Sequence, residues 1–299
     1  MELRVLRYFL AVAREENITA AAQTLHVTQP TLSKQLMDLE GEFGKKLFNR
    51  GKRKITLTED GMLLRKRAQE LIDLADRTEA ELRASDETVT GEVCIGAGET
   101  RGVRLLAGAV EELRGRYPGI RYSLFSGNGE DVAERLDKGL LDFGLFVGNT
   151  DFKKYDYLKL PVSDAWGLIL RKDSPLAAQA DIRPADIREI PLLCSRQALI
   201  RNELSGWLGY AFEQLHIVAT YNLVYNASLF VEAGIGAAIC IEGLVNTTGD
   251  SPLCFRPFRP RIAAELTLAW KKYQLLTKAQ EKFLEAVQRR AGAYAGRDA

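Results

Sequence analysis

Apolar residues recur at intervals of three or four through the first 45 positions. In the first segment they are Leu3, Leu6, Leu10 and Ala13; in the second, Ala21, Ala22 and Leu25; in the third, Leu32, Leu36, Leu39 and Phe43. This spacing places apolar side chains on one face of an α-helix. The pattern therefore predicts three amphipathic helices that share a small core.

The second and third segments are separated by a short polar turn, His26-Val27-Thr28. Thr28 supplies a side-chain oxygen for the free N–H groups at a helix start, and Pro30 falls in the first helical turn, where its missing N–H is harmless. The third helix is therefore expected to begin directly after Thr28. Two short helices across a tight turn form a helix-turn-helix, whose second helix enters the DNA major groove.

The polar face of the third segment carries short or amide-bearing side chains able to meet base edges. We expect this face to present Gln29, Pro30, Thr31, Ser33 and Lys34 to DNA. Base contacts are expected from Gln29, Ser33 and Lys34.

A basic run follows the third segment. Its members, without an acid between them, are Lys45, Lys46, Arg50, Lys52, Arg53 and Lys54. Residues 1–58 carry ten Lys or Arg and six Asp or Glu, a net charge of +4, although the whole chain carries only +1. Such a cluster favours contact with phosphates. The alternating Ile55–Thr58 segment predicts a strand of a two-stranded wing, from which Arg50 and Arg53 would contact the DNA backbone.

The pattern of residues 59–89 predicts a long linker helix. Thr58 is expected to cap its start, and the helix is expected to run to about Asp86. Its small and apolar positions form a heptad pattern: Gly61, Leu64, Ala68, Leu71, Ala75, Thr78 and Leu82. A heptad stripe indicates a partner helix, which favours a homodimer. The alternative is that the stripe packs against the chain's own DNA-binding unit.

From residue 90 the pattern changes to short apolar strands that alternate with helices. Strands are expected at 93–97, 120–125, 142–147, 166–170, 192–194, 217–221, 236–241 and 266–270, with helices at 103–117 and 131–138. This alternation predicts an α/β domain with parallel strands.

The stretch from residue 18 to 61 resembles LysR-type transcriptional regulators. The resemblance rests on Thr28-Gln29-Pro30, Ser33-Lys34-Gln35, Leu39-Glu40, Gly44, Leu47-Phe48 with Arg50, and Thr58-Glu59 with Gly61. Farther on, LDKGLLDFGLFVG and LFVEAGIGAAI are similar to two phrases of the family's effector domain. The resemblance implies a DNA-binding regulator, activating or repressing, that responds to a small molecule.

This resemblance implies an α/β multidomain fold: a winged helix-turn-helix at 1–58, a linker helix at 59–89 and a two-lobed periplasmic-binding-protein-like domain at 90–299. The first lobe would span about 90–160 and 267–299, and the second about 161–266, with crossings near 158–162 and 263–268. The family also implies operator DNA, a homotetramer built from homodimers, and RNA polymerase as partners.

Ligands of such a fold gather where strands end and helices begin. By matching position, the family's effector contacts would fall on Thr100, Ser126, Asn128 and Arg196. The guanidinium of Arg196 would suit a carboxylate effector, whereas Glu99 opposes a strongly anionic pocket. Glu242 stands where the family more often has a proline, which alters that rim.

The motifs of common enzyme classes are absent from the sequence. It contains no GxSxG, HExxH or phosphate-binding loop, and Gly96-Ala97-Gly98 matches only part of a dinucleotide motif. Two histidines and four scattered cysteines give no metal-ligand spacing. No catalysis, metal or cofactor is therefore expected.

The cysteines offer one alternative function. The family resemblance and a Cys194–Cys240 pair would suit a redox-sensing regulator, although buried reduced thiols are the simpler expectation. The amino-terminal segment lacks the apolar core of a secretion signal, and no apolar run is long enough to span a bilayer. The expected location is the cytoplasm, away from membranes.

Overall fold

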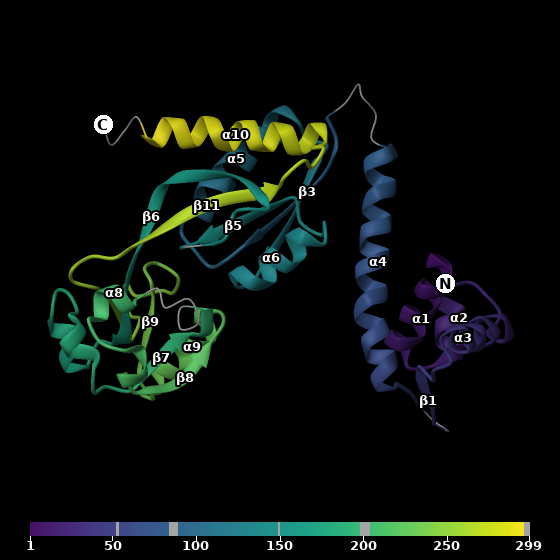
Figure 1. Ribbon diagram of the computed structural model, residues 1–299, viewed down its shortest axis with the longest axis horizontal. Helices are drawn as coiled ribbons and strands as arrows, with labels where there is room; N and C mark the ends of the chain where they lie inside the picture. Colours follow the sequence, from purple (N-terminus) through teal and green to yellow (C-terminus); the bar gives the residue numbers. More distant parts are fainter. Residues whose placement is uncertain (52–53, 84–88, 149, 198–203, 296–299) are drawn as a thin grey trace. The chain divides into compact units, whose positions relative to one another are not determined.

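The computed structural model describes the chain except residues 52–53, 84–88, 149, 198–203 and 296–299. The fold comprises two compact units, Met1–Ala84 and Ser85–Ala299. The first is mostly helical and the second is built around a large sheet (Figure 1).

The first unit contains the three predicted short helices, the wing and the long helix. Its elements are α1 (Leu3–Glu15), α2 (Ile18–Thr24), α3 (Gln29–Phe43), β1 (Phe48–Arg50), β2 (Ile55–Leu57) and α4 (Glu59–Arg83). β1 and β2 pair antiparallel, with Phe48 opposite Leu57. Arg53 lies outside the described residues.

Three helices of the first unit begin at side-chain caps. At the start of α4, Thr58 accepts the N–H of Gly61 at 3.0 Å, which confirms the cap predicted for the long helix. Asn17 accepts the N–H groups of Thr19 and Ala20 at 2.8 and 3.1 Å, and Thr28 accepts the N–H of Thr31 at 3.4 Å. The start of α3 predicted from Thr28 and Pro30 is therefore confirmed.

The core of the first unit forms where α1, α2 and α3 meet the wing. Phe9 contacts Phe48 with ring centroids 5.1 Å apart, and Leu32 and Leu36 are fully buried beside them. The face predicted for α1 is only partly correct. Leu6 is buried and Leu10 and Ala13 are half-buried against the core, but Leu3 is 46% exposed, and the most buried face lies about a quarter turn away, at Phe9 and Val12. The first helix has two adjacent apolar stripes, and only its packing partners select between them.

Glu40 joins the end of α3 to the wing. Its buried carboxylate accepts the N–H groups of Leu47 and Phe48 at 2.8 and 3.3 Å and the Lys46 ammonium at 3.3 Å. Burial acts to raise its pKa, but these three donors outweigh burial and hold the pKa of the Glu40 carboxyl below its ordinary value.

The heptad stripe predicted on α4 divides into two faces. Ala68 and Ile72 are buried against the short helices, and Gly61 passes so close to the wing that an added Cβ would lie 2.1 Å from the Leu47 carbonyl oxygen. Four leucines face solvent with exposed fractions of 60, 40, 40 and 82%: Leu63, Leu71, Leu74 and Leu82. One face of α4 therefore serves its own unit, and a second face is unpartnered in this single chain.

The second unit has two lobes. The first lobe contains β3 (Gly91–Ala97), α5 (Val103–Arg116), β4 (Ile120–Ser126), α6 (Gly129–Asp137), β5 (Phe143–Val147) and α10 (Lys278–Ala295). The second contains β7 (Leu192–Ser195), α8 (Ser205–Leu208), β8 (Ile217–Tyr221), α9 (Val224–Glu232), β9 (Ala237–Ile241) and β10 (Leu253–Pro257), with 3-10 turns at Pro175–Ala178, Pro184–Ile187 and Phe212–Gln214.

Two long strands pass through both lobes: β6 (Tyr155–Arg171) and β11 (Ala263–Lys271). They pair antiparallel with each other from Tyr155–Lys271 to Ala165–Ala263, with one irregularity near Glu265. The sheet order is β4-β3-β5-β11-β6-β9-β7-β8, with β10 on β6. The prediction of parallel strands is correct for β3, β4 and β5 and for β7, β8 and β9, but wrong for the crossing strands β6 and β11. β10, a strand that the sequence pattern did not predict, pairs antiparallel with β6.

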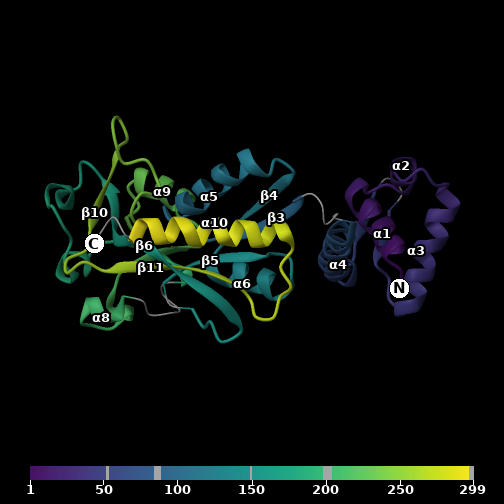
Figure 2. The same cartoon turned by 90° about the horizontal axis from the view of Figure 1, so that it is seen from above.

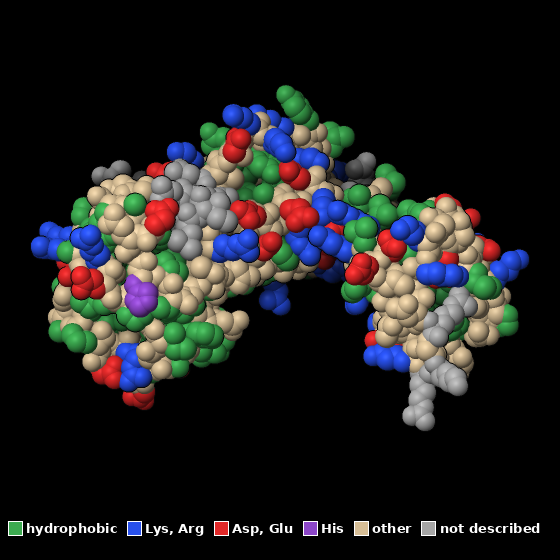
Figure 3. Space-filling view, turned by 60° about the horizontal axis from the view of Figure 1, so that its bottom comes forward, with side chains coloured by type: hydrophobic (Ala, Val, Ile, Leu, Met, Phe, Trp, Pro, Cys, Tyr) green, Lys and Arg blue, Asp and Glu red, His purple; other side chains and the backbone are tan. Residues whose placement is uncertain are grey.

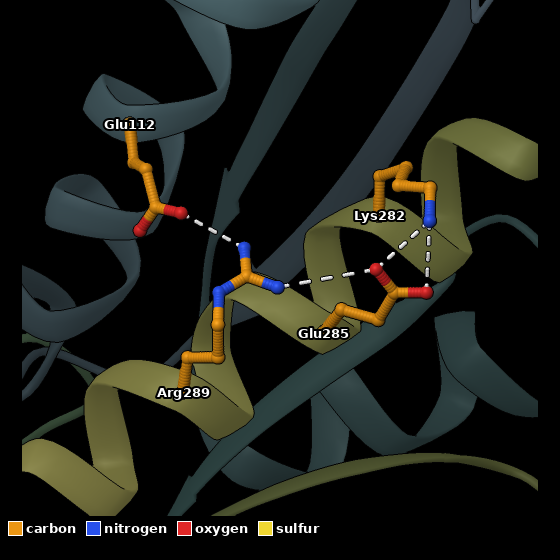
Figure 4. Close-up of polar contacts among 4 residues, drawn as sticks. All are labelled: Glu112, Lys282, Glu285 and Arg289. Atoms are coloured by element: carbon orange, nitrogen blue, oxygen red, sulfur yellow. Dashed lines mark hydrogen bonds and ion pairs between the residues drawn. The ribbon is translucent and has the colours of Figure 1, made fainter.

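Helices cover both faces of the first lobe's sheet. α5 and α10 lie on one face and α6 on the other (Figures 1 and 2). Figure 4 shows Arg289 of α10 donating to Glu112 of α5 at 2.8 Å, while Lys282 contacts Glu285 one turn along α10. These exposed pairs add little stability, and the layer depends on the apolar contacts beneath them.

Charged side chains of both signs are interspersed on the face that Figure 3 shows, with hydrophobic ones between them. This mixture agrees with the net charge of +1. Among the described helices, none is both long and apolar enough to cross a membrane.

Replacing Glu40 by alanine should destabilise the first unit by about 2–3 kcal/mol, because two buried N–H groups lose a charged acceptor. Hydrogen exchange over residues 1–84 measures this loss, while the three tryptophans, all beyond residue 85, report the second unit by fluorescence. Glu42→Ala is the control, since its pair with the amino terminus is exposed. Equal exchange in both variants would contradict the assigned role of Glu40.

Candidate DNA interface and effector cavity

The outward face of α3 carries the residues predicted to meet DNA. Gln29, Pro30, Thr31 and Lys34 are exposed and Ser33 is half-buried. They lie there because Leu32, Leu36 and Leu39 turn the opposite face into the core. Met37, 48% exposed, belongs to the same surface. Its apolar side chain gave no reason to expect it there.

Lys34 has no acid partner among the described residues, unlike the other described lysines of the first unit's DNA-facing region. Lys45, Lys46 and Lys54 contact Asp60, Glu40 and Glu16 at 3.5, 3.3 and 2.6 Å. Among the residues that the structure describes, no acid lies within ion-pair distance of Lys34. Its charge is therefore available to a ligand, and the basic run is partly neutralised by acids distant in sequence. The Lys45 and Lys54 pairs are exposed on both sides and are therefore weak and exchangeable, whereas the carboxylate in the Lys46 pair is buried.

Thr31 has a local task at the start of α3. Its hydroxyl lies 2.7 Å from that of Thr28, so both threonines hold the turn in place. His26 completes this turn with a positive φ of 54°, a conformation that few residues other than glycine adopt.

A cavity of about 90 Å³ lies between the lobes of the second unit. This space can hold several ordered waters or a small molecule that replaces them. Its apolar lining is Leu145, Val147, Trp166, Leu223, Val224, Ile241 and Leu244; its polar side chains are Glu99, Asn128, Ser195, Gln197, Tyr221, Asn222 and Cys240.

Of the four predicted effector contacts, only Asn128 lines this cavity. Thr100 is buried and donates its hydroxyl hydrogen to Asp164, beside the cavity rather than in it. Ser126 and Arg196 are exposed and lie outside the lining. The roles of these four residues remain predictions.

Glu99 connects the two lobes. It follows β3 in the first lobe, and its Oε2 accepts the N–H of Val224 at the start of α9 in the second lobe at 2.5 Å. Burial raises the pKa of the Glu99 carboxyl, and the Val224 N–H offsets part of that rise. A second link joins Arg101 and Glu242 at 3.3 Å. The acid at position 242, where the family more often has proline, therefore contributes to the joint between lobes.

Two further cavity groups are kept in their neutral forms by burial. Burial, reinforced by nearby Glu99, raises the pKa of the Cys240 thiol far above its usual range. Burial likewise raises the pKa of the Tyr221 phenol, whose hydroxyl donates to the Ile239 carbonyl at 2.5 Å. Neither group is prepared to act as a nucleophile, since the reactive form of a thiol is the thiolate.

The register of the sheet separates the two cysteines of the proposed redox pair. Cys194 lies opposite Ile239, so Cys240, the next residue, faces the other side of the sheet. Cys194 accordingly packs with Leu192, and Cys240 with Leu193. This arrangement opposes a disulfide between them. The described residues also hold no cluster of three potential metal ligands.

Comparison with known proteins assigns both units. Residues 3–62 match the model of the bacterial regulatory helix-turn-helix protein, lysR family, and residues 86–292 match the LysR substrate binding domain. The chain belongs to the LysR family. This family is made of transcriptional regulators, and the chain is a LysR-type DNA-binding regulator with an effector-binding domain.

The similarity extends over the full length of known members. The chain is 31% identical over 296 residues to the Hca operon transcriptional activator HcaR of Escherichia coli (strain K12). The matched region covers 97% of this chain and 98% of HcaR. Full-length CbnR complexed with its target DNA has a similar fold, with a TM-score of 0.75 at 23% identity over 97% and 100% of the two chains. A full-length OxyR variant from Pseudomonas aeruginosa matches with a TM-score of 0.57 at 22% identity over 96% and 99%.

The sequence pattern did not identify Gln197, Tyr221 or Trp166 as cavity residues. Gln197 belongs to no recognisable motif, and the other two are typical of strands that fill a core. Only the register of the strands shows that they end at one cavity. The sequence signal that could have identified these residues was their position at or next to the ends of predicted strands.

Glu99→Gln should stabilise the protein at pH 7, by on the order of 1–3 °C in Tm. The raised pKa means that ionisation favours the unfolded chain, so the stability contributed by Glu99 is full below its unfolded pKa and is lost as pH rises through the folded pKa. Glutamine keeps an acceptor for the Val224 N–H and carries no charge. The gain in Tm should therefore shrink towards pH 4, as measured by tryptophan fluorescence.

The control is Glu92→Gln, an exposed acid on β3, the strand that precedes Glu99, and this variant should leave Tm unchanged across the pH range. A pH-independent difference for Glu99→Gln would show that burial does not govern its ionisation.

Proposed function

We propose that this LysR-type regulator binds operator DNA as a homodimer, with α3 of each copy in a major groove. The observation that carries the proposal is the outward polar face of α3, with Lys34 exposed and free of any described acid partner. Gln29, Ser33 and Lys34 would contact base edges. Pro30 and Thr31 would lie at the groove entrance, and Arg50 and Arg53 would hold the DNA backbone.

The exposed leucines of α4 support the homodimer. A row of four leucines on one helix face is costly to leave in water, and burying it against a second copy removes apolar area from solvent. A dimer would also match two operator half-sites, as helix-turn-helix dimers do. A tetramer and contact with RNA polymerase extend this proposal by analogy with the family alone.

The cavity between the lobes supports a small-molecule effector. HcaR and CbnR belong to the same family, and a ligand that favours one arrangement of the lobes would shift the population of DNA-binding states. We propose Asn128, with Glu99, Ser195 and Gln197, as effector contacts. Thr100, Ser126 and Arg196 stay predictions that the cavity does not support.

Lys34→Glu should weaken binding to the intergenic DNA upstream of the gene by about a hundredfold, because it removes a base contact and adds repulsion from phosphates. Lys34→Gln should cost about tenfold. Fluorescence anisotropy with labelled DNA, titrated across salt, measures both.

Lys153→Glu makes the same charge change on an exposed lysine of the second unit and should bind as the wild type does. Operator affinity retained by Lys34→Glu would remove α3 from the interface and overturn the proposed mode of binding.

Leu74→Glu should convert dimers into monomers, because it places a charge in the exposed leucine row. Sedimentation velocity at micromolar protein measures the change. Met62→Glu is the matched control: Met62 is 57% exposed on the same helix but lies on a different face from the row. If both variants associate like the wild type, α4 is not the dimer contact.

A further inference from the structure

Three helix starts lie in or beside the cavity, and at each of them a described N–H group is already bonded to an oxygen of the protein. At α5, Gly102 N–H donates to the Thr100 hydroxyl oxygen at 3.0 Å. At α6, Gly129 N–H donates to Gln197 Oε1 at 2.8 Å, and Asn128 Oδ1 accepts the next two N–H groups. At α9, Val224 N–H donates to Glu99. Helix starts are the usual anion sites of such folds, and here the chain's own oxygens occupy them.

The charge of the cavity lining also disfavours an anionic ligand. Glu99 is the only ionisable side chain with a negative charge among the described residues of the lining, which include no lysine, arginine or histidine. Two donors near Glu99 are already engaged: the Tyr221 hydroxyl donates to Ile239, and the N–H of Leu223 donates to Asn222 Oδ1. A carboxylate entering this cavity would meet an acid and no cationic side chain among the described lining residues.

The Glu99 carboxylate can accept further hydrogen bonds. Its Oε2 accepts the Val224 N–H, while no donor among the described residues reaches Oε1. A carboxylate that is partly removed from water and has no cationic partner gains from one. Around it, Leu145, Val147, Trp166 and Leu244 offer apolar surface, and the indole of Trp166 suits a cation as well as a hydrocarbon.

We propose that the effector is a small organic ammonium, an amine with a short apolar body, whose N–H groups bond to Glu99. This inference rests on the proposed effector role of the cavity and names its ligand class. It replaces the carboxylate expected from Arg196, which is exposed and lies outside the lining. Because Glu99 bridges β3 and α9, an ammonium bound to it would act at the joint between the lobes.

The test is direct binding of isosteric probes to the full-length protein without DNA. Isothermal titration calorimetry compares benzylamine with benzoate and benzyl alcohol, and n-butylamine with butyrate, at pH 7. We expect at least one amine to bind about tenfold more tightly than the carboxylate of equal size, because a charged hydrogen bond is gained. In Glu99→Gln this preference should disappear, while the neutral alcohol binds as before.

Glu92→Gln is the control, because it removes an equal charge from an exposed position on β3, the strand that precedes Glu99, and should keep the preference for the amine. A carboxylate that binds more tightly than its amine, or a panel in which no amine binds at millimolar concentration, would overturn the inference. Operator binding is measured separately. If the wild type shows no preference for amines but binds operator DNA, the inference fails and the proposed function stands. If the wild type does not bind operator DNA, the proposed function is refuted.

Discussion

The antiparallel pairing of β6 with β11 is the constraint on which the second unit depends. A strand of 17 residues runs through both lobes beside its partner, so the lobes share one sheet and cannot move independently of that ribbon. The parallel strands on either side end where the ribbon crosses. Their ends, and the helices that follow them, therefore face a common space, and this is where the cavity lies.

The first unit uses one long helix for two purposes. The face of α4 with Ala68 and Ile72 completes the core under the short helices, and Glu40 fixes the wing to the end of α3. The face with Leu63 and Leu74 remains in solvent. In the proposed homodimer the same helix would complete its own core and contact a second copy, which would couple dimer formation to the geometry of α3 and hold two recognition helices at a fixed spacing.

In the cavity, hydrogen bonding decides ligand chemistry more than shape does. A helix start attracts anions only while its N–H groups are free. Gln197, Asn128 and Glu99 occupy those groups, so the same fold that can bind anions presents an acid and acceptor oxygens instead. If this cavity is the effector site, as proposed, these few side chains decide which ligand chemistry it accepts.

The sequence alone determined the helix-turn-helix, the cap at Thr28, the long helix and most strands, because each depends on local spacing and capping. It also located Asn128 near the cavity. Tertiary structure decided the face of α1, the division of the α4 stripe and the antiparallel direction of β6 and β11. It also decided that, among the described residues of the lining, no cationic side chain accompanies Glu99. These properties depend on pairings between residues far apart in the chain, and periodicity within one segment carries no information about the partner that a segment will meet.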